Sequence, residues 1–258
     1  MTENSQQTRT ETYDGTEPVQ PVHVVLVPGF WLGAWAWDDV VPHLGAAGLV
    51  PHPVTLPGLA PQDTAADRAA VTREDHVAAV ADLVDGLDGD VVLVGHSGGG
   101  PVVQQVVDRN PGRVRRVVYV DTGPLVDGAA LNPGLPDDAA ELPLPSWEEL
   151  AEQGSSTEGL DDAALAAFRE RAVPMPAGVA RGTVRVADPA RLAVPATVVC
   201  SSIPSAVLAE LATPGPPLHT ELGEIADLTY VDVPTGHWPM LSRPRELADA
   251  IVAAARQG

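Results

Sequence analysis

The stretch from residue 91 to residue 103 reads VVLVGHSGGGPVV, in which a serine stands among glycines between two apolar runs. Residues 95–99 (GHSGG) fit the pattern GxSxG, and their flanks predict a buried strand that turns sharply into a helix. Such a turn leaves little room for Cβ atoms and pushes the serine side chain outward. A phosphate-binding loop would instead carry GxGxxG or a lysine, and GHSGGG has neither. The pattern therefore predicts that Ser97 is a nucleophile rather than part of a flexible turn.

His237 is predicted to take the proton from Ser97, because a serine hydroxyl at neutral pH is a poor nucleophile without a base. It lies in the stretch PTGHWPM, between the last predicted strand and the terminal helix, where a loop can fold back over the serine. The other six histidines are expected to be structural. His96 should point away from Ser97 in a tight turn, and His23 opens a strand. Helical or loop segments that look surface-exposed contain His43, His52, His76 and His219.

A scaffold for these residues is indicated by the chain from residue 22 onward, which alternates strand-like and helix-like segments. Apolar runs at 23–29, 49–58, 90–95 and 116–121 are separated by helical spacing at 34–48, 72–87 and 98–109. Thr72 is the expected N-cap of the second helix. The alternation resumes with strands at 195–202 and 228–234 and a terminal helix at 243–257. Repeated strand–helix–strand units predict an α/β fold with a mostly parallel central sheet flanked by helices.

Residues 122–190 interrupt this alternation. They are rich in Pro, Asp, Glu and Ala, with helix-like pieces at 146–153 and 160–173. We expect a helical lid inserted after the strand that ends at Asp121. The first 21 residues are polar and lack the apolar core of a signal peptide, so they are expected to be a disordered tail. The predicted organisation is a tail over 1–21 and a single domain over 22–258.

With GHSGG placed in this order of elements, the chain resembles the α/β-hydrolase family over residues 22–257, and more closely the small bacterial esterase-like members of that family. The resemblance implies a serine hydrolase that works through an acyl-enzyme without a metal or an organic cofactor. It also implies that His237 is the catalytic histidine and that the backbone N–H groups of Gly98 and Phe30 form the oxyanion hole. The substrate it favours is an ester or lactone of a small hydrophobic molecule.

The acid that would orient His237 is not where most of the family carries it. That place reads CSSIPSAVL at 200–208, with no Asp or Glu before Glu210. Some branches, among them haloalkane dehalogenases and fungal zearalenone-lactone hydrolases, take the acid from the tip of the strand next to the nucleophile strand. Asp121 has that place here and is the predicted third catalytic residue, the alternative being that it only caps the turn into the lid. Asp232, followed by Asp127 and Glu210, are the other candidates.

The aromatic residues after the first strand can line an acyl pocket or pack between loop and helix. We expect Phe30 and Trp31 near the site, with Trp31 contacting the substrate, and Trp35 and Trp37 in the core. A dehalogenase or epoxide hydrolase needs Asp at the nucleophile position, so Ser97 excludes both activities. A hydroxynitrile lyase characteristically has a lysine in its site, and this chain has no lysine. Carbon–carbon bond hydrolysis and cofactor-free perhydrolysis stay open on the same three residues. So does a binding protein or a biosynthetic cyclase that keeps the fold without hydrolysis.

Composition limits the partners. The formal net charge of −20 disfavours nucleic acid and anionic membranes. All 15 basic residues are arginines, which excludes Schiff-base chemistry on a lysine. The single Cys200 is expected to be a small core residue, and no stretch has the ~18 apolar residues of a membrane helix. We expect a cytoplasmic protein that acts on a small molecule, and its oligomeric state is not indicated.

Overall fold

The structure is a computed structural model that describes residues 20–212 and 220–257. Apart from Gln20 and Pro21, the predicted tail lies outside this range, and so does His219. The predictions for these residues stay predictions.

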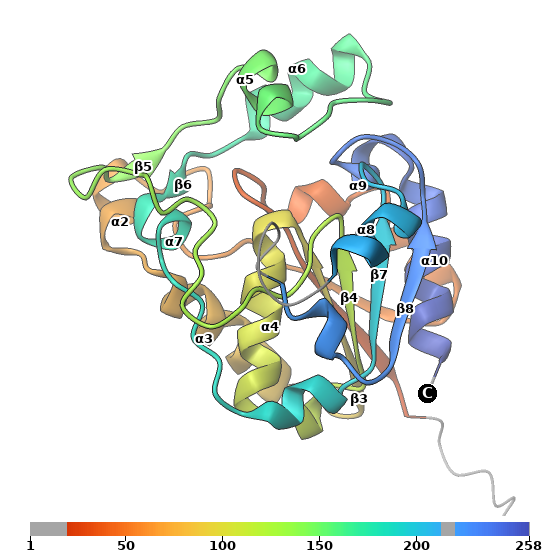
Figure 1. The fold of residues 1–258 in the computed structure, drawn as a ribbon. Helices are drawn as coiled ribbons and strands as arrows, with labels where there is room; N and C mark the ends of the chain where they lie inside the picture. The colour runs from red at the N-terminus through yellow and green to blue at the C-terminus, as the bar shows by residue number, and fades with distance from the viewer. Residues whose placement is uncertain (1–19, 213–219, 258) are drawn as a thin grey trace, which may run out of the picture.

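Six parallel strands form the central sheet, in the order β2-β1-β3-β4-β7-β8. All residues of β4 and β7 are buried, because strands covered by helices on both faces expose neither side. Parallel strands have their carboxyl ends at the same edge, so the segments that follow β3, β4 and β8 meet there (Figure 1). The strands are β1 (Val22–Val27), β2 (Val50–Pro53), β3 (Asp90–His96), β4 (Arg116–Val120), β7 (Ala196–Cys200) and β8 (Leu228–Asp232).

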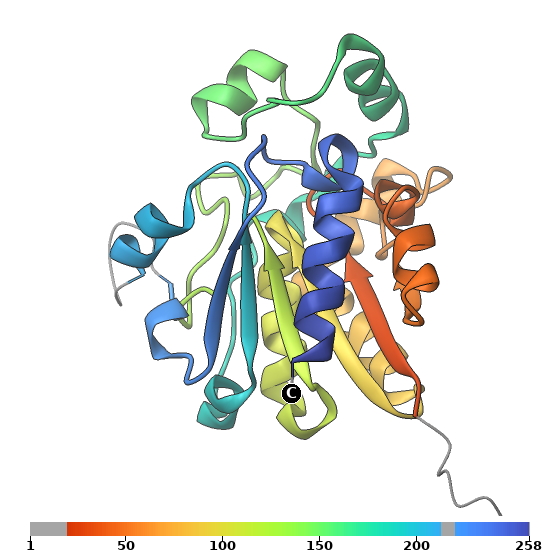
Figure 2. The same ribbon diagram turned by 90° about the vertical axis from the view of Figure 1, so that its right-hand side faces the viewer.

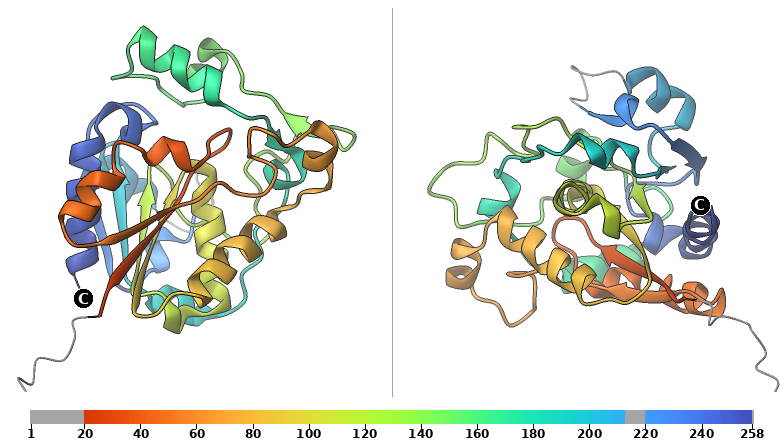
Figure 3. Two further views of the ribbon diagram at one scale, coloured as in Figure 1. Left: turned by 180° about the vertical axis from the view of Figure 1, so that it is seen from behind. Right: turned by 90° about the horizontal axis from the view of Figure 1, so that it is seen from below.

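Helices cover both faces of this sheet (Figure 2 and Figure 3). On one face lie α3 (Arg73–Asp85) and α4 (Gly100–Arg109), and on the other α1 (Val41–Ala46) and α10 (Pro244–Arg256). α3 begins at the predicted N-cap Thr72, whose hydroxyl accepts from the Asp75 N–H. The helix predicted over 34–48 is instead divided into the 3-10 turn η1 (Ala34–Trp37) and α1. Pro42 explains the division, since it has no N–H and its ring clashes with a helical carbonyl four residues earlier.

Several short helices have no counterpart in the sequence prediction. They are α2 (Ala65–Ala70), α8 (Ser205–Leu211) and α9 (Pro239–Ser242), with the 3-10 turns η3 (Pro111–Arg113) and η5 (Leu222–Glu224). A further 3-10 turn, η2 (Ser97–Gly99), joins β3 to α4. No helix in the part of the chain that the structure describes is long and apolar enough to cross a membrane.

Residues 121–195, between β4 and β7, are called the insertion below. They contain an antiparallel ribbon of β5 (Glu141–Leu142) and β6 (Met175–Pro176), and the helices α5 (Trp147–Glu152), α6 (Asp162–Arg171), α7 (Ala177–Ala180) and η4 (Pro189–Ala193). α5 and α6 lie within the helical pieces predicted at 146–153 and 160–173. Both are beyond the arrowheads of the parallel strands (Figure 1 and Figure 2), at the edge of the sheet where β3, β4 and β8 end.

Candidate active site

Ser97 lies directly after β3, where the chain turns at once into η2 and α4. Its backbone φ is 48°, in the left-handed region that is strained for a residue with a side chain. A Cβ on Gly99 would lie 2.7 Å from the carbonyl oxygens of Val27 and Pro28. One on Gly95 would lie 2.8 Å from the carbonyl oxygen of Gly99. A larger residue at either glycine would push backbone apart, which explains why the elbow has this composition.

Ser97, His237 and Asp121 follow β3, β8 and β4 and form a chain of hydrogen bonds. Oγ of Ser97 lies 2.8 Å from Nε2 of His237, and Nδ1 of His237 lies 2.5 Å from Oδ2 of Asp121. An ionised carboxylate only accepts, so Nδ1 carries the proton and Nε2 accepts from the serine hydroxyl. In this geometry a histidine can take up the hydroxyl proton while the carboxylate stabilises the charge on the ring.

Asp121 is hydrogen-bonded to the segment after β7, residues 201–208, which contains no Asp or Glu. Its Oδ1 accepts from the N–H groups of Ser201 and Ser202, at 3.2 and 2.8 Å, and its Oδ2 accepts from Oγ of Ser202 at 2.7 Å. Burial acts to raise the pKa of Asp121, but the hydrogen bonds from His237 and Ser202 outweigh it and hold the pKa below its usual range. The carboxylate is therefore ionised and fixed in orientation.

The other candidate acids have different partners. Asp232, at the end of β8, accepts from the N–H and the hydroxyl of Ser205, at 2.8 and 2.6 Å. Asp127 accepts from the Val186 N–H at 3.0 Å. Glu210 is exposed on α8. Of the carboxylates weighed from the sequence, the structure brings Asp121 to His237.

Phe30 and Gly98 lie against one another beside the elbow, since a Cβ on Gly98 would run into the Phe30 ring. Within the described chain, no backbone carbonyl accepts from the Phe30 N–H. The Gly98 N–H belongs to the first helical turn, whose N–H groups lack partners in the helix and carry a partial positive charge. This arrangement suits an oxyanion, and its binding there stays a prediction.

Trp31 is only 9% exposed and joins the loop after β1 to the insertion. Its indole N–H donates to the Leu142 carbonyl at 3.0 Å, and its own carbonyl accepts from the Val173 N–H at 3.0 Å. Contact with a substrate stays a prediction for this residue. Trp37 is fully buried as expected for the core. Trp35, also expected there, is only partly buried, with the Arg171 guanidinium 4.6 Å above its ring.

None of the other described histidines is hydrogen-bonded to Ser97. Nε2 of His96 donates to the His237 carbonyl at 2.7 Å, and burial lowers the pKa of the His96 ring. The prediction of a surface-like place is wrong for His76, which is fully buried, with Nε2 2.8 Å from the Pro57 carbonyl. His76 lies on the buried face of α3, which also carries Val77 and Val80. His23 and His52 pair across β1 and β2 at 2.9 Å, and His43 is exposed on α1.

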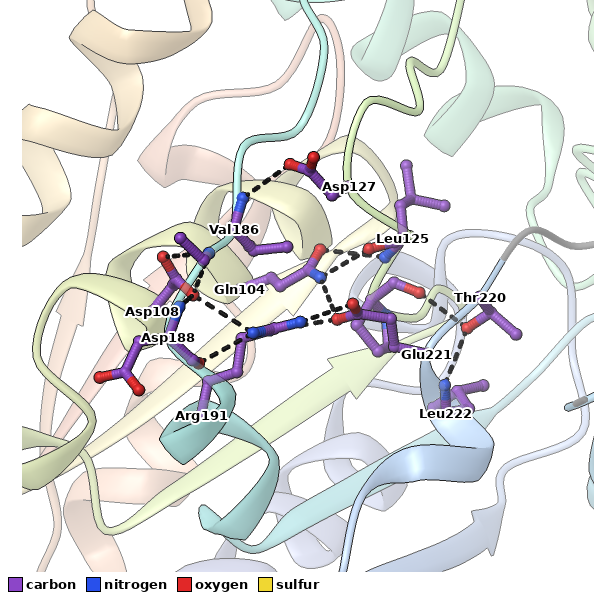
Figure 4. Close-up of polar contacts among 12 residues, drawn as sticks. Gln104, Asp108, Leu125, Asp127, Val186, Asp188, Arg191, Thr220, Glu221 and Leu222 are labelled. Atoms are coloured by element: carbon purple, nitrogen blue, oxygen red, sulfur yellow. Dashed lines mark hydrogen bonds and ion pairs between the residues drawn. The ribbon is translucent and has the colours of Figure 1, made fainter. Parts of the chain in front are cut away.

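A polar network ties the end of the insertion to α4, the helix that follows Ser97 (Figure 4). Arg191 donates to both carboxylate oxygens of Glu221, at 2.6 and 3.2 Å, and reaches Asp108 of α4 at 3.4 Å. Gln104 of α4 donates to Glu221 at 2.9 Å and exchanges two hydrogen bonds with the backbone of Leu125. The network therefore fixes α4 relative to the loop that starts at Asp121.

A cavity of about 190 Å³ lies beside Asp121, between the loops that follow β4 and β7. Its lining includes Asp121 and Ser202 but neither Ser97 nor His237, so it is not where a reacting carbonyl would lie. Cys200 also lines it and is buried as expected, and burial raises the pKa of the Cys200 thiol to about 12. The rest of the lining is mainly apolar and includes Pro124, Leu125, Val199, Leu208 and Leu222.

Comparison with known proteins adds relatives of named activity. The carbendazim hydrolyzing esterase of Nocardioides sp. is 39% identical over 105 residues, which are 38% of this chain and 40% of that one. The chain thus spans less than half the length of that relative. The pyrethroid hydrolase of Sphingobium wenxiniae is 26% identical over 251 residues, which are 88% of this chain and 85% of that one.

A solved structure shares the fold. The extracellular alpha/beta-hydrolase from a Paenibacillus species has a TM-score of 0.71 at 21% identity, covering 92% of this chain and all of that one. A model described as the alpha/beta hydrolase family matches residues 24–250. The match covers most of the sequence and includes the elbow at Ser97, and the relatives include bacterial esterases, so the chain belongs to the alpha/beta hydrolase family.

Proposed function

We propose that this protein is a serine hydrolase that cleaves an ester or lactone of a small hydrophobic molecule through an acyl-enzyme intermediate. The observation that carries the proposal is the hydrogen-bonded chain from Ser97 through His237 to Asp121. The names of two relatives, an esterase and a pyrethroid hydrolase, support the reaction class. The cytoplasmic location expected from the sequence stays a prediction.

Acylation follows from the three side chains. Oγ of Ser97 attacks the substrate carbonyl carbon while its proton passes to Nε2 of His237, and Asp121 stabilises the imidazolium. The N–H groups of Phe30 and Gly98 stabilise the oxyanion of the tetrahedral intermediate. His237 then gives its proton to the leaving alcohol, and the acyl group remains on Ser97. In the second half-reaction His237 deprotonates a water molecule, which attacks the acyl carbon. His237 then returns the proton to Oγ of Ser97 as the bond between that oxygen and the acyl carbon breaks and the acid leaves.

Buried aromatic side chains pack the histidine loop against the insertion. The Trp238 ring stands edge-on to the His237 ring, with centroids 5.0 Å apart. Trp238 also packs against Trp147 of α5 and Phe168 of α6, with centroids 6.3 and 5.2 Å apart. The insertion therefore brings apolar surface to the histidine loop, and we assign it the role of the predicted lid.

A fluorophosphonate probe tests the proposal, because it labels only a serine that an adjacent base activates. We expect the wild-type protein to be labelled at Ser97 and to hydrolyse p-nitrophenyl butyrate. Ser97→Ala should abolish labelling and lower turnover by at least ~10³-fold, since oxyanion and binding effects alone remain. A folded Ser97→Ala variant with wild-type turnover would end the proposal. A γ-lactone and p-nitrophenyl esters of increasing acyl length, assayed in parallel, decide the substrate class.

A further inference from the structure

The loop that carries His237 is hydrogen-bonded to the insertion. The His237 N–H donates to the Ser156 carbonyl at 2.7 Å, and the Gly236 N–H donates to the Glu158 carbonyl at 2.9 Å. Oγ1 of Thr235 also lies within hydrogen-bond distance of the Glu158 carbonyl, at 3.1 Å. Three successive residues of the loop thus bond to two residues of one short segment between α5 and α6.

The two segments approach each other backbone to backbone. A Cβ on Gly236 would lie 2.7 Å from both the backbone N and the carbonyl oxygen of Glu158. Gly159 has φ 85°, and a Cβ there would lie 2.6 Å from Oγ1 of Thr235. Contacts this close leave the loop little freedom to shift while the insertion stays in place.

Thr235 connects the loop to a third segment. Its side chain is buried, and its Oγ1 lies 2.8 Å from Oγ of Ser242 at the end of α9. Thr235 gives its one proton to the Glu158 carbonyl, which leaves its oxygen free to accept from Ser242, whose hydroxyl also lies 3.2 Å from the Trp238 carbonyl. On the far side of the loop, His96 donates to the His237 carbonyl at 2.7 Å. The backbone of His237 is therefore bonded at its N–H by the insertion and at its carbonyl by the residue before Ser97.

We infer that residues 156–158 of the insertion position His237 for proton transfer, and that Thr235 is the positioning side chain that links them to the histidine loop. This inference rests on the proposed function, in which His237 is the base. The distance from Nε2 to the serine oxygen depends on where the loop lies above the end of β3. A displacement of about 1 Å in such a geometry can cost about 10²-fold in rate. The insertion then sets the rate of the chemical step in addition to covering the site.

Thr235→Val tests this, because it keeps the shape of the side chain and removes the hydroxyl. We expect kcat for p-nitrophenyl butyrate to fall about tenfold, a fraction of the loss that misplacement can cause, with KM little changed. Thr235→Ser keeps the hydroxyl and should restore kcat to within about twofold. Thr229→Val is the matched control, the same change on a half-buried residue of β8. It should leave kcat unchanged.

A second variant and a spectroscopic readout separate positioning from general damage. Gly236→Ala places a methyl group against the Glu158 backbone and should lower kcat more than Thr235→Val does. The downfield proton resonance of His237 Nδ1–H should shift or broaden in Thr235→Val and be unchanged in Thr229→Val, at equal melting temperatures.

The outcomes are distinguishable. Wild-type kcat and an unshifted resonance in Thr235→Val would overturn the inference while leaving the hydrolase intact. So would a Thr235→Ser enzyme as slow as Thr235→Val. If Ser97→Ala keeps wild-type turnover, the proposed function fails, whatever the Thr235 variants show.

Discussion

At the scale of single residues, Asp121, the proposed acid, stands at a place that departs from the common family pattern. Asp121 follows β4, and the segment after β7 contributes Ser201 and Ser202, which donate to its carboxylate. The end of β4 thus supplies the carboxylate, and the end of the adjacent strand β7 supplies the groups that donate hydrogen bonds to it. Asp121 has φ 48°, so its backbone is strained much as that of Ser97 is. Strain at two residues of one hydrogen-bonded chain is typical of functional sites.

Asp121→Asn should preserve the fold and lower turnover by up to ~10⁴-fold, because an amide favours the wrong tautomer of His237. Asp232→Asn is the control, since Asp232 bonds Ser205 and is exposed. Melting temperature and turnover per titrated active site should be measured for both. An inactive Asp232→Asn beside an active Asp121→Asn would reverse the assignment. If Asp121 only caps a turn, its variant would lose about 0.5–2 kcal/mol of stability and keep its turnover.

At the scale of elements, α3 carries a histidine whose protonation opposes folding. Burial lowers the pKa of His76 to about 4, whereas in the unfolded chain the side chain titrates at about 6.5. Between these two pKa values the unfolded state binds a proton at His76 and the folded state does not. The resulting stabilisation is fully present above about pH 6.5 and is lost as the pH falls toward 4.

His76→Gln removes this titration and keeps an N–H that can reach the Pro57 carbonyl. Between pH 7 and 4.5, its free energy of unfolding should fall by about 2–3 kcal/mol less than that of the wild type. Urea denaturation at the two pH values measures the difference. His43→Gln, on the exposed side of α1, should behave like the wild type. Equal pH dependence of His76→Gln and the wild type would mean that His76 is protonated in the folded protein.

The strands and longer helices could be predicted from sequence because each depends on a local pattern. Valine runs specify β3, β4 and β7, and spacing with a capping threonine specifies α3. The elbow was recognisable for the same reason, whereas His237 was predicted from its place between the last strand and the terminal helix. Short elements such as α2, α8 and the β5–β6 ribbon were not predicted. They contain too few residues to show a hydrophobic periodicity, and tertiary contacts determine whether they form.

Burial was harder to predict than secondary structure. His76, expected to lie at the surface, is fully buried, because local composition does not reveal which face of a helix a neighbouring element covers. The residues that hydrogen-bond to Asp121 and to the histidine loop were not predicted, for a related reason. Ser202, Ser156 and Glu158 contribute through hydrogen bonds to residues far along the chain, and one sequence carries no signal of such pairs.

At the scale of the whole molecule, the pair of Arg191 and Glu221 joins the insertion, α4 and the segment before β8 (Figure 4). Their side chains are only 11% and 8% exposed. Arg191→Met leaves Glu221 as a buried charge without its cation, and should lower the free energy of unfolding by about 3–5 kcal/mol. The double variant Arg191→Met/Glu221→Leu should recover most of this loss. Urea denaturation of the single and double variants measures both.

An exposed pair provides the comparison for Arg191. Arg243 and Glu246 lie 3.3 Å apart, three residues apart in the chain, with side chains about half exposed. Arg243→Met should change stability by less than about 1 kcal/mol, because water solvates the remaining carboxylate. Should Arg191→Met prove equally mild, Glu221 must be able to reach solvent or take up a proton.

The insertion contacts two loops, the one after β1 and the one that carries His237. Leu142 and Val173 bond Trp31, and the segment at 156–158 bonds the loop at 235–237. A chimera that received this segment from a relative would therefore also receive foreign anchors for two loops outside the exchanged region. Exchanging the insertion would therefore change substrate selectivity and turnover at the same time. An exchange that keeps activity has to carry position 31 and positions 235–237 along with the insertion.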